Sequence, residues 1–225
     1  MSEPRMVEVR RNVLKENDLR AQRLREGFRR SGTKVISLVS SPGSGKTTLL
    51  ERLLTDLARE YHVAALVGDL ATDNDAARLA RSGAPVKQIT TGTVCHLDAR
   101  MIEHALEGWD IQNLDFLFIE NVGNLVCPSS FDLGEDLRLV LVSTTEGEDK
   151  PLKYPTIFNT SDVAVVTKTD LADAVGLDMN ALLENIQRVR PGMQVMKVSS
   201  RTGAGIHELE QYLLATRVNA TARAG

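Results

Sequence analysis

The sequence predicts an α/β fold in which helices cover both faces of a mostly parallel sheet. Short apolar runs rich in β-branched residues alternate with longer amphipathic stretches from residue 35 to residue 217. Most of these runs are apolar at consecutive positions, as the interior strands of a parallel sheet are. A glycine-rich turn at residues 40–47 joins the first run to the first amphipathic stretch. These three observations indicate parallel strands that are connected by helical crossovers.

The expected strands and helices alternate in chain order. Strands are expected at residues 35–39, 63–69, 86–90, 114–120, 137–143, 162–168 and 194–199. Helices are expected at residues 46–60, 73–82, 97–107, 153–160, 178–190 and 205–217. Before the first strand, residues 5–30 form a separate expected helix that begins after Pro4.

Length and composition are those of a globular domain. With 225 residues, of which 42% are hydrophobic, the chain can bury a full core without disulfides. No apolar run reaches the roughly 18 residues of a membrane span, and the charged first residues lack the pattern of a secretory signal. A net charge of −3 gives no reason to expect a basic face for nucleic acid. We therefore expect a cytoplasmic protein that binds neither membranes nor nucleic acids.

A phosphate-binding loop is the strongest local signal. Residues 40–47 read SSPGSGKT and lie between an expected strand and an expected helix. Backbone N–H groups in such a P-loop, together with the helix N-terminus, bind phosphate oxygens. The predicted nucleotide-binding residues here are Gly43, Ser44, Gly45, Lys46, Thr47 and Thr48. Lys46 would reach the β- and γ-phosphates and Thr47 would bind Mg²⁺, whereas Ser40 replaces the usual first glycine.

Two later segments predict that the bound base is guanine. Residues 167–170 read TKTD and resemble the N-K-x-D motif of GTPases, whose aspartate accepts hydrogen bonds from guanine N1–H and the 2-amino group. Adenine lacks both donors, so Lys168 and Asp170 favour GTP and GDP over ATP. Thr167 stands where asparagine is usual, and an Asp-capped turn is the alternative interpretation. The last expected strand leads into a loop that resembles the guanine-binding S-A-K loop, at Ser199, Ser200 and Arg201.

Carboxylates at the ends of strands predict a Mg²⁺ site beside the phosphates. Asp69 ends the second expected strand, Asp75 follows shortly after it, and Glu120 ends the fourth. The carboxyl ends of parallel strands meet where ligands bind, so these oxygens would hold Mg²⁺ or its waters together with Thr47. Helix capping by Asp73 or Asp75 is the alternative. The predicted catalytic residues are Lys46, Asp75, Glu120 and Gly123, the last of which would offer its backbone N–H to the γ-phosphate.

Thiol and imidazole groups form a third group of candidate residues. Cys95 and His96 are adjacent, and Cys127 follows soon after Gly123. Two thiolates and one imidazole suit a soft or borderline ion such as Ni²⁺ or Zn²⁺. Adjacent ligands can share a metal only in a loop or at a helix start, and Gly92 precedes such a loop. Three ligands leave one place for an exchangeable ligand or a symmetric partner, whereas two buried cysteines and an unrelated histidine are the alternative.

The motifs together resemble the HypB family of hydrogenase-maturation GTPases. The matching segments cover nearly the whole chain and read VLKEND at 13–18, SSPGSGKTT, GDLATDNDAARL, TGTVCHLDARMI, ENVGNLVCP, GEDKPLKYP and TKTDL. The resemblance implies a fold of the signal-recognition and MinD class and a GTP-dependent homodimer. It also implies a Ni²⁺ or Zn²⁺ site between subunits at Cys95, His96 and Cys127, and partners that include other maturation proteins and the hydrogenase large subunit. The N-terminal cysteine motif and histidine-rich tract of some members are missing from this sequence.

The expected organisation is a helical arm (1–33), a P-loop GTPase domain with inserted metal-binding loops (34–217) and a flexible tail (218–225).

Three other functions stay open. A urease-type nickel accessory GTPase usually has Cys-Pro-His in one motif, whereas Cys and His lie apart from Cys127-Pro128 here. A P-loop small-molecule kinase would not need TKTD, and a pure binding module would use GTP only to set its affinity for a partner. Lys153 could contact a phosphate of its own or the neighbouring subunit, although a solvated lysine is more common.

Overall fold

One parallel sheet of seven strands organises the computed structural model, which describes residues 5–69, 74–110 and 113–221, with the backbone alone for 5–10 and 218–221. The strands are β1 (Lys34–Ser40), β2 (Val63–Asp69), β3 (Val86–Thr90), β4 (Phe116–Glu120), β5 (Leu137–Ser143), β6 (Val163–Thr167) and β7 (Gln194–Lys197). Their order across the sheet is β3-β2-β4-β1-β5-β6-β7, and every neighbouring pair is parallel. The predicted fold class is therefore confirmed.

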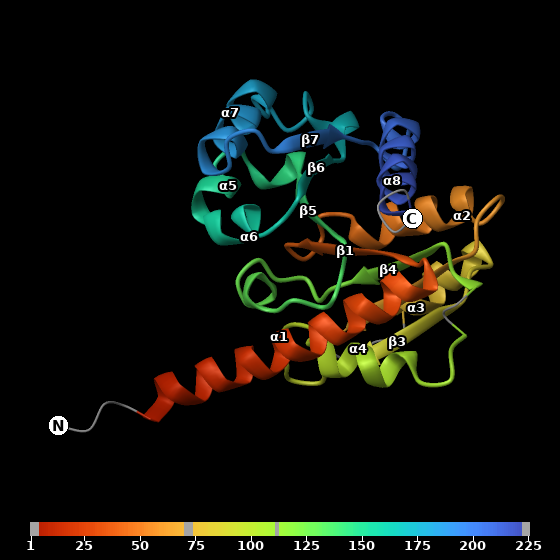
Figure 1. The fold of residues 1–225 in the computed structure, drawn as a ribbon. Helices are drawn as coiled ribbons and strands as arrows, with labels where there is room; N and C mark the ends of the chain where they lie inside the picture. Colours follow the sequence, from red (N-terminus) through yellow and green to blue (C-terminus); the bar gives the residue numbers. More distant parts are fainter. Residues whose placement is uncertain (1–4, 70–73, 111–112, 222–225) are drawn as a thin grey trace.

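Helices cover both faces of this sheet (Figure 1). They are α1 (Arg5–Ser31), α2 (Lys46–Leu57), α3 (Asn74–Leu79), α4 (Ala99–Leu106), α5 (Lys150–Lys153), α6 (Pro155–Asn159), α7 (Met179–Val189) and α8 (Ile206–Thr221). Successive strand residues point to opposite faces. Ile36 therefore packs in a core with α2 and α8, whereas its neighbour Val35 packs in a core with α1 and α4. A third core joins α6 and α7 to β5 and β6.

The helix expected over residues 153–160 is wrong in its extent. The chain instead forms the two short helices α5 and α6, separated at Tyr154, whose φ of −126° and ψ of 55° lie outside the helical region. Tyr154 precedes Pro155, and the proline ring disfavours a helical conformation in the residue before it. At the other end of the chain, α8 continues to Thr221, past the expected end at residue 217.

The carboxyl ends of the central strands meet at one edge of the sheet. β1 lies between β4 and β5 and leads directly into the P-loop and α2. Glu120 at the end of β4 is in register with Leu38 of β1 and Val67 of β2. The crossover from β1 leads to β2 on one side, whereas the crossover from its neighbour β4 leads to β5 on the other side. A crevice opens at the edge where such crossovers diverge, and ligands bind there in open α/β sheets.

The N-terminal helix packs across one face of the sheet next to α4 (Figure 1). Phe28 is buried in this contact with Ile102 and Ala105 of α4, and Ala21 is buried where Gly134 approaches α1. The first turns of α1 extend away from the body of the molecule (Figure 1). The C-terminal part of the helix is therefore the part that belongs to the core.

Candidate nucleotide and metal sites

A pocket of about 480 Å³ lies at the carboxyl edge of the sheet. The P-loop and the start of α2, the ends of β2 and β4, helix α3 and the residue after β6 make its wall. The lining residues are Pro42, Gly43, Gly45, Lys46, Thr47, Thr48, Gly68, Asp69, Asp75, Arg78, Glu120, Asn121, Val122, Gly123 and Lys168. The structure thus brings together most of the residues predicted to bind phosphate and Mg²⁺. Asp73 lies outside the described residues.

Lys46 is buried beneath the P-loop. Its Nζ donates to the Ser40 hydroxyl at 2.9 Å, so the residue that departs from the usual glycine holds the P-loop lysine. Burial lowers the pKa of Lys46, although the nearby carboxylates of Glu120 and Asp75 oppose this effect. A phosphate oxygen would offer this amino group a stronger acceptor than a serine hydroxyl does.

Glu120 has one oxygen engaged and one oxygen without a partner. Thr47 Oγ1 donates to Glu120 Oε1 at 2.7 Å, whereas Oε2 is buried and finds no hydrogen-bond partner among the described residues. Burial raises the pKa of Glu120 to about 7. Buried polar atoms in folded proteins normally have a partner. An unpaired carboxylate oxygen beside a threonine hydroxyl therefore fits the oxygen ligands that Mg²⁺ prefers.

The segment predicted to read the base also braces the P-loop. Thr167 Oγ1, at the position where asparagine is usual, donates to the Ser44 carbonyl at 2.6 Å and so braces the P-loop. Lys168 has a φ of 56° and donates through Nζ to the Gly43 carbonyl at 2.7 Å. Below the loop, Ser44 Oγ donates to Glu146 Oε2 at 2.8 Å. The loop is therefore held by hydrogen bonds to β6 and to the end of β5.

The two predicted guanine-binding segments meet, although they are far apart in sequence. Ser199 Oγ donates to Asp170 Oδ1 at 2.6 Å and fixes the orientation of that carboxylate. Arg201 Nη1 lies 4.0 Å from Asp170 Oδ2. Ser200 lies between Ser199 and Arg201 in the same loop. The positive φ of Gly203 and Gly205 lets the loop turn back toward α8.

Gly123 lies against the P-loop. A Cβ atom at this position would be 3.0 Å from Pro42 Cα and 3.1 Å from Pro42 N, too close for any side chain without movement of the loop. Glycine at this position therefore lets the backbone lie closer to the phosphate end of the pocket than a residue with a side chain would allow. Lys153, in contrast, is exposed and pairs with Asp149 at 2.7 Å.

The three predicted metal ligands lie together beside this pocket. Cys95 Sγ and Cys127 Sγ are 3.0 Å apart, and the ligand atoms of Cys95, His96 and Cys127 all lie within 4.8 Å of one another. Both cysteines are free thiols. The hydrogen bond that Cys95 donates to Cys127 raises the pKa of the Cys95 thiol. A metal ion would replace the shared proton, because thiolates are the form that coordinates.

His96 is prepared for coordination by its surroundings. Its ring stacks on Phe131, with 3.9 Å between the ring centres. Burial lowers the pKa of His96, which favours the neutral imidazole that metals bind. Its Nδ1 atom is buried and has no hydrogen-bond partner within the described part of the chain.

Two asparagines connect the loop that carries Cys95 and His96 to the end of β4. Asn121 Oδ1 accepts from Leu97 N at 3.0 Å, and Asn124 Nδ2 donates to the Cys95 carbonyl at 3.2 Å. The Leu97 side chain packs so closely on Gly68 that a Cβ at residue 68 would be 2.8 Å from Leu97 Cγ. Leu97 is thus in contact with β2 and with the residue that follows β4, and these two strands carry predicted Mg²⁺ ligands.

Some residues of these sites were not predicted. Arg78 lines the same pocket as Asp75. It follows Asp75 by three residues on α3, a spacing that places two side chains on the same face of a helix and could have indicated its position. Arg138 is buried and donates to the Phe131 carbonyl at 2.8 Å and to the Pro128 carbonyl at 3.5 Å, so it supports the turn that carries Cys127. No local sequence signal marks Arg138, because its partners depend on the tertiary fold.

Comparison with known proteins identifies the family. A model described as the CobW/HypB/UreG nucleotide-binding domain matches residues 34–197. The hydrogenase maturation factor HypB of Azotobacter vinelandii is 47% identical over 208 residues, which cover 92% of this chain and 69% of that protein. The chain belongs to the HypB family.

Solved structures agree with this assignment. HypB from Helicobacter pylori, crystallised in complex with nickel, has a TM-score of 0.86 and 39% identity, over 91% of this chain and 96% of that one. The signal recognition particle 54 kDa protein from Aeropyrum pernix, in complex with GDP, has a TM-score of 0.58 at 16% identity, over 85% of this chain and 49% of that one. The HypB fold of this chain is therefore of the signal-recognition class, as predicted.

Among the described residues, no helix has the length and apolar character needed to cross a membrane.

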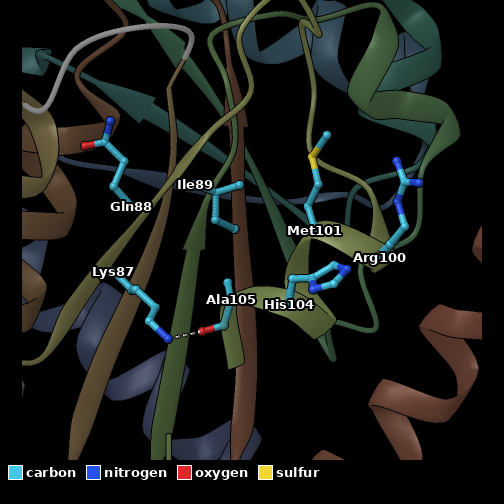
Figure 2. A pocket seen from close by; sticks show the side chains of 7 residues that line it. All are labelled: Lys87, Gln88, Ile89, Arg100, Met101, His104 and Ala105. Carbon is cyan, nitrogen blue, oxygen red and sulfur yellow. Dashed lines mark hydrogen bonds between the residues drawn. The ribbon is translucent and has the colours of Figure 1, made fainter. Parts of the chain in front are cut away.

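A second hollow, of about 500 Å³, lies between β3 and α4 (Figure 2). It is lined by Lys87, Gln88, Ile89, Arg100, Met101, His104 and Ala105, none of which is a predicted site residue of this HypB-family chain. Figure 2 shows the Lys87 amino group turned to the Ala105 carbonyl, to which it donates at 2.8 Å, and it also donates to the Glu107 carbonyl at 3.0 Å. Lys87 thereby caps the C-terminal end of α4. We assign this hollow to the packing of α4 against an edge strand.

Replacing Arg78 by alanine is expected to weaken nucleoside triphosphate binding by roughly tenfold, because charge-assisted hydrogen bonds to phosphate are lost. The Arg78 guanidinium donates to Glu51 Oε2 at 2.7 Å and to Thr48 Oγ1 at 3.0 Å, which holds it at the pocket wall. Fluorescence titration would measure the affinity, with Arg81→Ala as the control because Arg81 is exposed. Equal nucleotide affinities of the two variants would show that Arg78 does not contact phosphate and only holds α3 against α2.

Proposed function

We propose that this protein is a GTP-hydrolysing metallochaperone that delivers Ni²⁺ to a hydrogenase during maturation. The observation that carries the proposal is that one short loop joins two sites. Residues 120–127 begin with Glu120 in the phosphate pocket and end with Cys127 in the thiol and imidazole cluster. The names of two relatives support the proposed client and cargo: one is a hydrogenase maturation factor, and the other was crystallised in complex with nickel.

The nucleotide proposed for the pocket is GTP. Lys46 would exchange the Ser40 hydroxyl for a phosphate oxygen, and Lys168 would lie along the guanine ring. The orientation of Asp170 by Ser199 supports a carboxylate that accepts from guanine N1–H and the 2-amino group. Mg²⁺, which would neutralise charge on the β- and γ-phosphates, would be held by the oxygens of Thr47, Asp69, Asp75 and Glu120.

The cargo proposed for the second site is Ni²⁺, which Cys95, His96 and Cys127 would hold. Zn²⁺ suits the same ligands and is the competing ion. Three ligands from one chain leave the coordination open, and a homodimer that places two such clusters face to face would complete it. The proposed partners are other maturation proteins and the hydrogenase large subunit, and the proposed compartment is the cytoplasm.

Nucleotide state is expected to change Ni²⁺ affinity by roughly 5- to 150-fold, the usual range of coupling between two sites. Gly123 lies against Pro42, so a γ-phosphate would move the backbone only a few residues before Cys127. Calorimetric Ni²⁺ titration with GDP and with a non-hydrolysable GTP analogue would measure the coupling, together with the molecular mass in each state. Since linkage is reciprocal, Ni²⁺ should change the affinity for the GTP analogue relative to GDP by the same factor.

Single ligand variants separate the parts of this proposal. Cys127→Ala should remove the difference between nucleotide states and leave nucleotide binding intact. Cys95→Ala or His96→Ala should lower Ni²⁺ affinity in both states. Identical Ni²⁺ affinities with GDP and with the GTP analogue, in a protein whose mass does not respond to nucleotide, would contradict the coupling.

A further inference from the structure

The buried side chain of Asn17, on α1, hydrogen-bonds to two loops at once. Its Oδ1 accepts from Ala99 N at 2.9 Å, and its Nδ2 donates to the Asp132 carbonyl at 2.8 Å. Ala99 is the first residue of α4, where backbone N–H groups have no partner within the helix. One amide therefore satisfies a helix N-terminus on one side and a loop carbonyl on the other.

These two loops are the ones that carry the metal ligands. The first runs through Cys95 and His96 to Ala99, and the second runs through Cys127 and Phe131 to Asp132. The stacking of His96 on Phe131 brings the two loops into direct contact. Near β4, Asn121 and Asn124 join the same loops, as described above. Asn17 ties them at their far ends, so the cluster lies between two sets of amide hydrogen bonds.

Helix α1 is held closely enough to act as a fixed support. A Cβ on Gly134 would lie 2.8 Å from the Ala21 carbonyl oxygen and 2.8 Å from Leu24 Cβ, so only glycine allows this approach. Arg25 Nη2 donates to Asp132 Oδ1 at 2.6 Å, and Arg20 pairs with Glu103 of α4 at 2.8 Å. The helix thus has ionic contacts with both sides of the gap that Asn17 bridges.

We infer that Asn17 is a positioning residue for the proposed metal site, because it fixes the separation between the loop that carries His96 and the loop that carries Cys127. This inference rests on the proposed function of Cys95, His96 and Cys127. It gives α1 a role in metal binding, although no described side chain of α1 belongs to the cluster. The VLKEND segment, which includes Asn17, then has a function of its own within the fold.

Two substitutions at this position are expected to lower metal affinity by different means. Asn17→Ala removes both hydrogen bonds. Asn17→Asp keeps an acceptor for Ala99 N and places a negative charge at the N-terminus of α4, which is favourable, but it repels the Asp132 carbonyl. We expect both variants to bind Ni²⁺ about tenfold more weakly, at the lower end of the 10–100-fold losses seen when groups that orient ligands are removed. GDP affinity should be unchanged.

The test measures Ni²⁺ binding by calorimetry and the absorption spectrum of the Co²⁺-loaded full chain, with the thermal midpoint of each variant. Phe28→Leu is the matched control, because Phe28 anchors α1 in the core and its replacement leaves both Asn17 hydrogen bonds in place. We expect Phe28→Leu to lower the thermal midpoint without changing the Co²⁺ spectrum. Asn17→Asp should also lower the thermal midpoint, because it buries a charge against the Asp132 carbonyl, but unlike Phe28→Leu it should change the thiolate and ligand-field bands.

The outcomes separate this inference from the proposed function. If Cys95→Ser abolishes Ni²⁺ binding while both Asn17 variants bind as the wild type does, the inference is overturned and the proposed metal site stands. If metal affinity merely follows the thermal midpoint across the Asn17 and Phe28 variants, α1 contributes stability alone and the inference is also overturned. If Cys95→Ser and wild type bind Ni²⁺ equally, both the metal site and the inference fail.

Discussion

Asp170→Asn is expected to lower GTP affinity by roughly 10³-fold and to shift the preference toward xanthine nucleotides. In wild type, GTP and GDP should bind at least about 10³-fold more tightly than ATP, since a site built to accept hydrogen bonds rejects a ligand that lacks the donors. The asparagine amide would present N–H groups to the guanine donors. Xanthine has a carbonyl in place of the 2-amino group and can accept from that amide.

Competition binding of GTP, XTP and ATP to wild type and Asp170→Asn would measure these preferences. Asp173→Asn is the control, because Asp173 is exposed in the same loop and has the same charge to lose. Equal binding of ATP and GTP by the wild type would exclude the guanine assignment. A loss of all nucleotides in Asp170→Asn, without a gain for XTP, would instead indicate that the Ser199 hydrogen bond holds the loop together.

Glu120→Gln is expected to stabilise the nucleotide-free protein by about 3 kcal/mol above neutral pH. Burial raises the pKa of Glu120 from its ordinary value of 4.5, which an unfolded chain would give it, to about 7. Below the unfolded pKa the carboxyl is protonated in both states, and its full contribution to stability is present. As the pH rises from the unfolded pKa through the folded pKa, the unfolded chain has lost the proton that the folded protein still holds, so the stability falls, and the loss is complete above the folded pKa.

Thermal unfolding of the nucleotide-free protein between pH 4.5 and pH 8 would test this. The midpoint of Glu120→Gln should exceed that of wild type by roughly 6 to 12 °C at pH 8, and the difference should shrink toward zero at pH 4.5. Glu60→Gln, at an exposed position, is the control and should show no such trend. A constant difference across the pH range would show that Glu120 keeps its ordinary pKa. With Mg²⁺ and GTP present, the sign should reverse, because the proposed ligand is lost.

Local sequence patterns were sufficient for the elements that bind phosphate. The apolar run of β1, the glycines of the P-loop and the amphipathic pattern of α2 are all encoded within residues 34–57. Glu120 and Asp69 could be predicted as pocket residues because parallel strands place their carboxyl ends at one edge. The break at Tyr154 was also encoded locally, by Pro155, and was missed because the apolar pattern continues through it.

Contacts between distant segments could not be read from the sequence. Asn17 and Asp132 are 115 residues apart, and Thr167 and Ser44 are 123 residues apart. Their hydrogen bonds depend on how helices and strands pack, which periodicity does not describe. The sequence placed Cys95, His96 and Cys127 near the nucleotide pocket only through the short spacing from Gly123. The asparagines that hold these loops lie in segments that resemble the family, but nothing in the sequence indicated their hydrogen bonds.

The bracing of the P-loop by Thr167 and Lys168 has a consequence for how a nucleotide would bind. The groups proposed to hold the base and the phosphates belong to one rigid frame, because the same two residues join β6 to the loop. A ligand that spans both halves therefore gains the chelate effect, since binding of one half raises the effective concentration of the other. Guanosine alone or pyrophosphate alone should bind weakly, whereas GDP joins them on a frame that is already assembled.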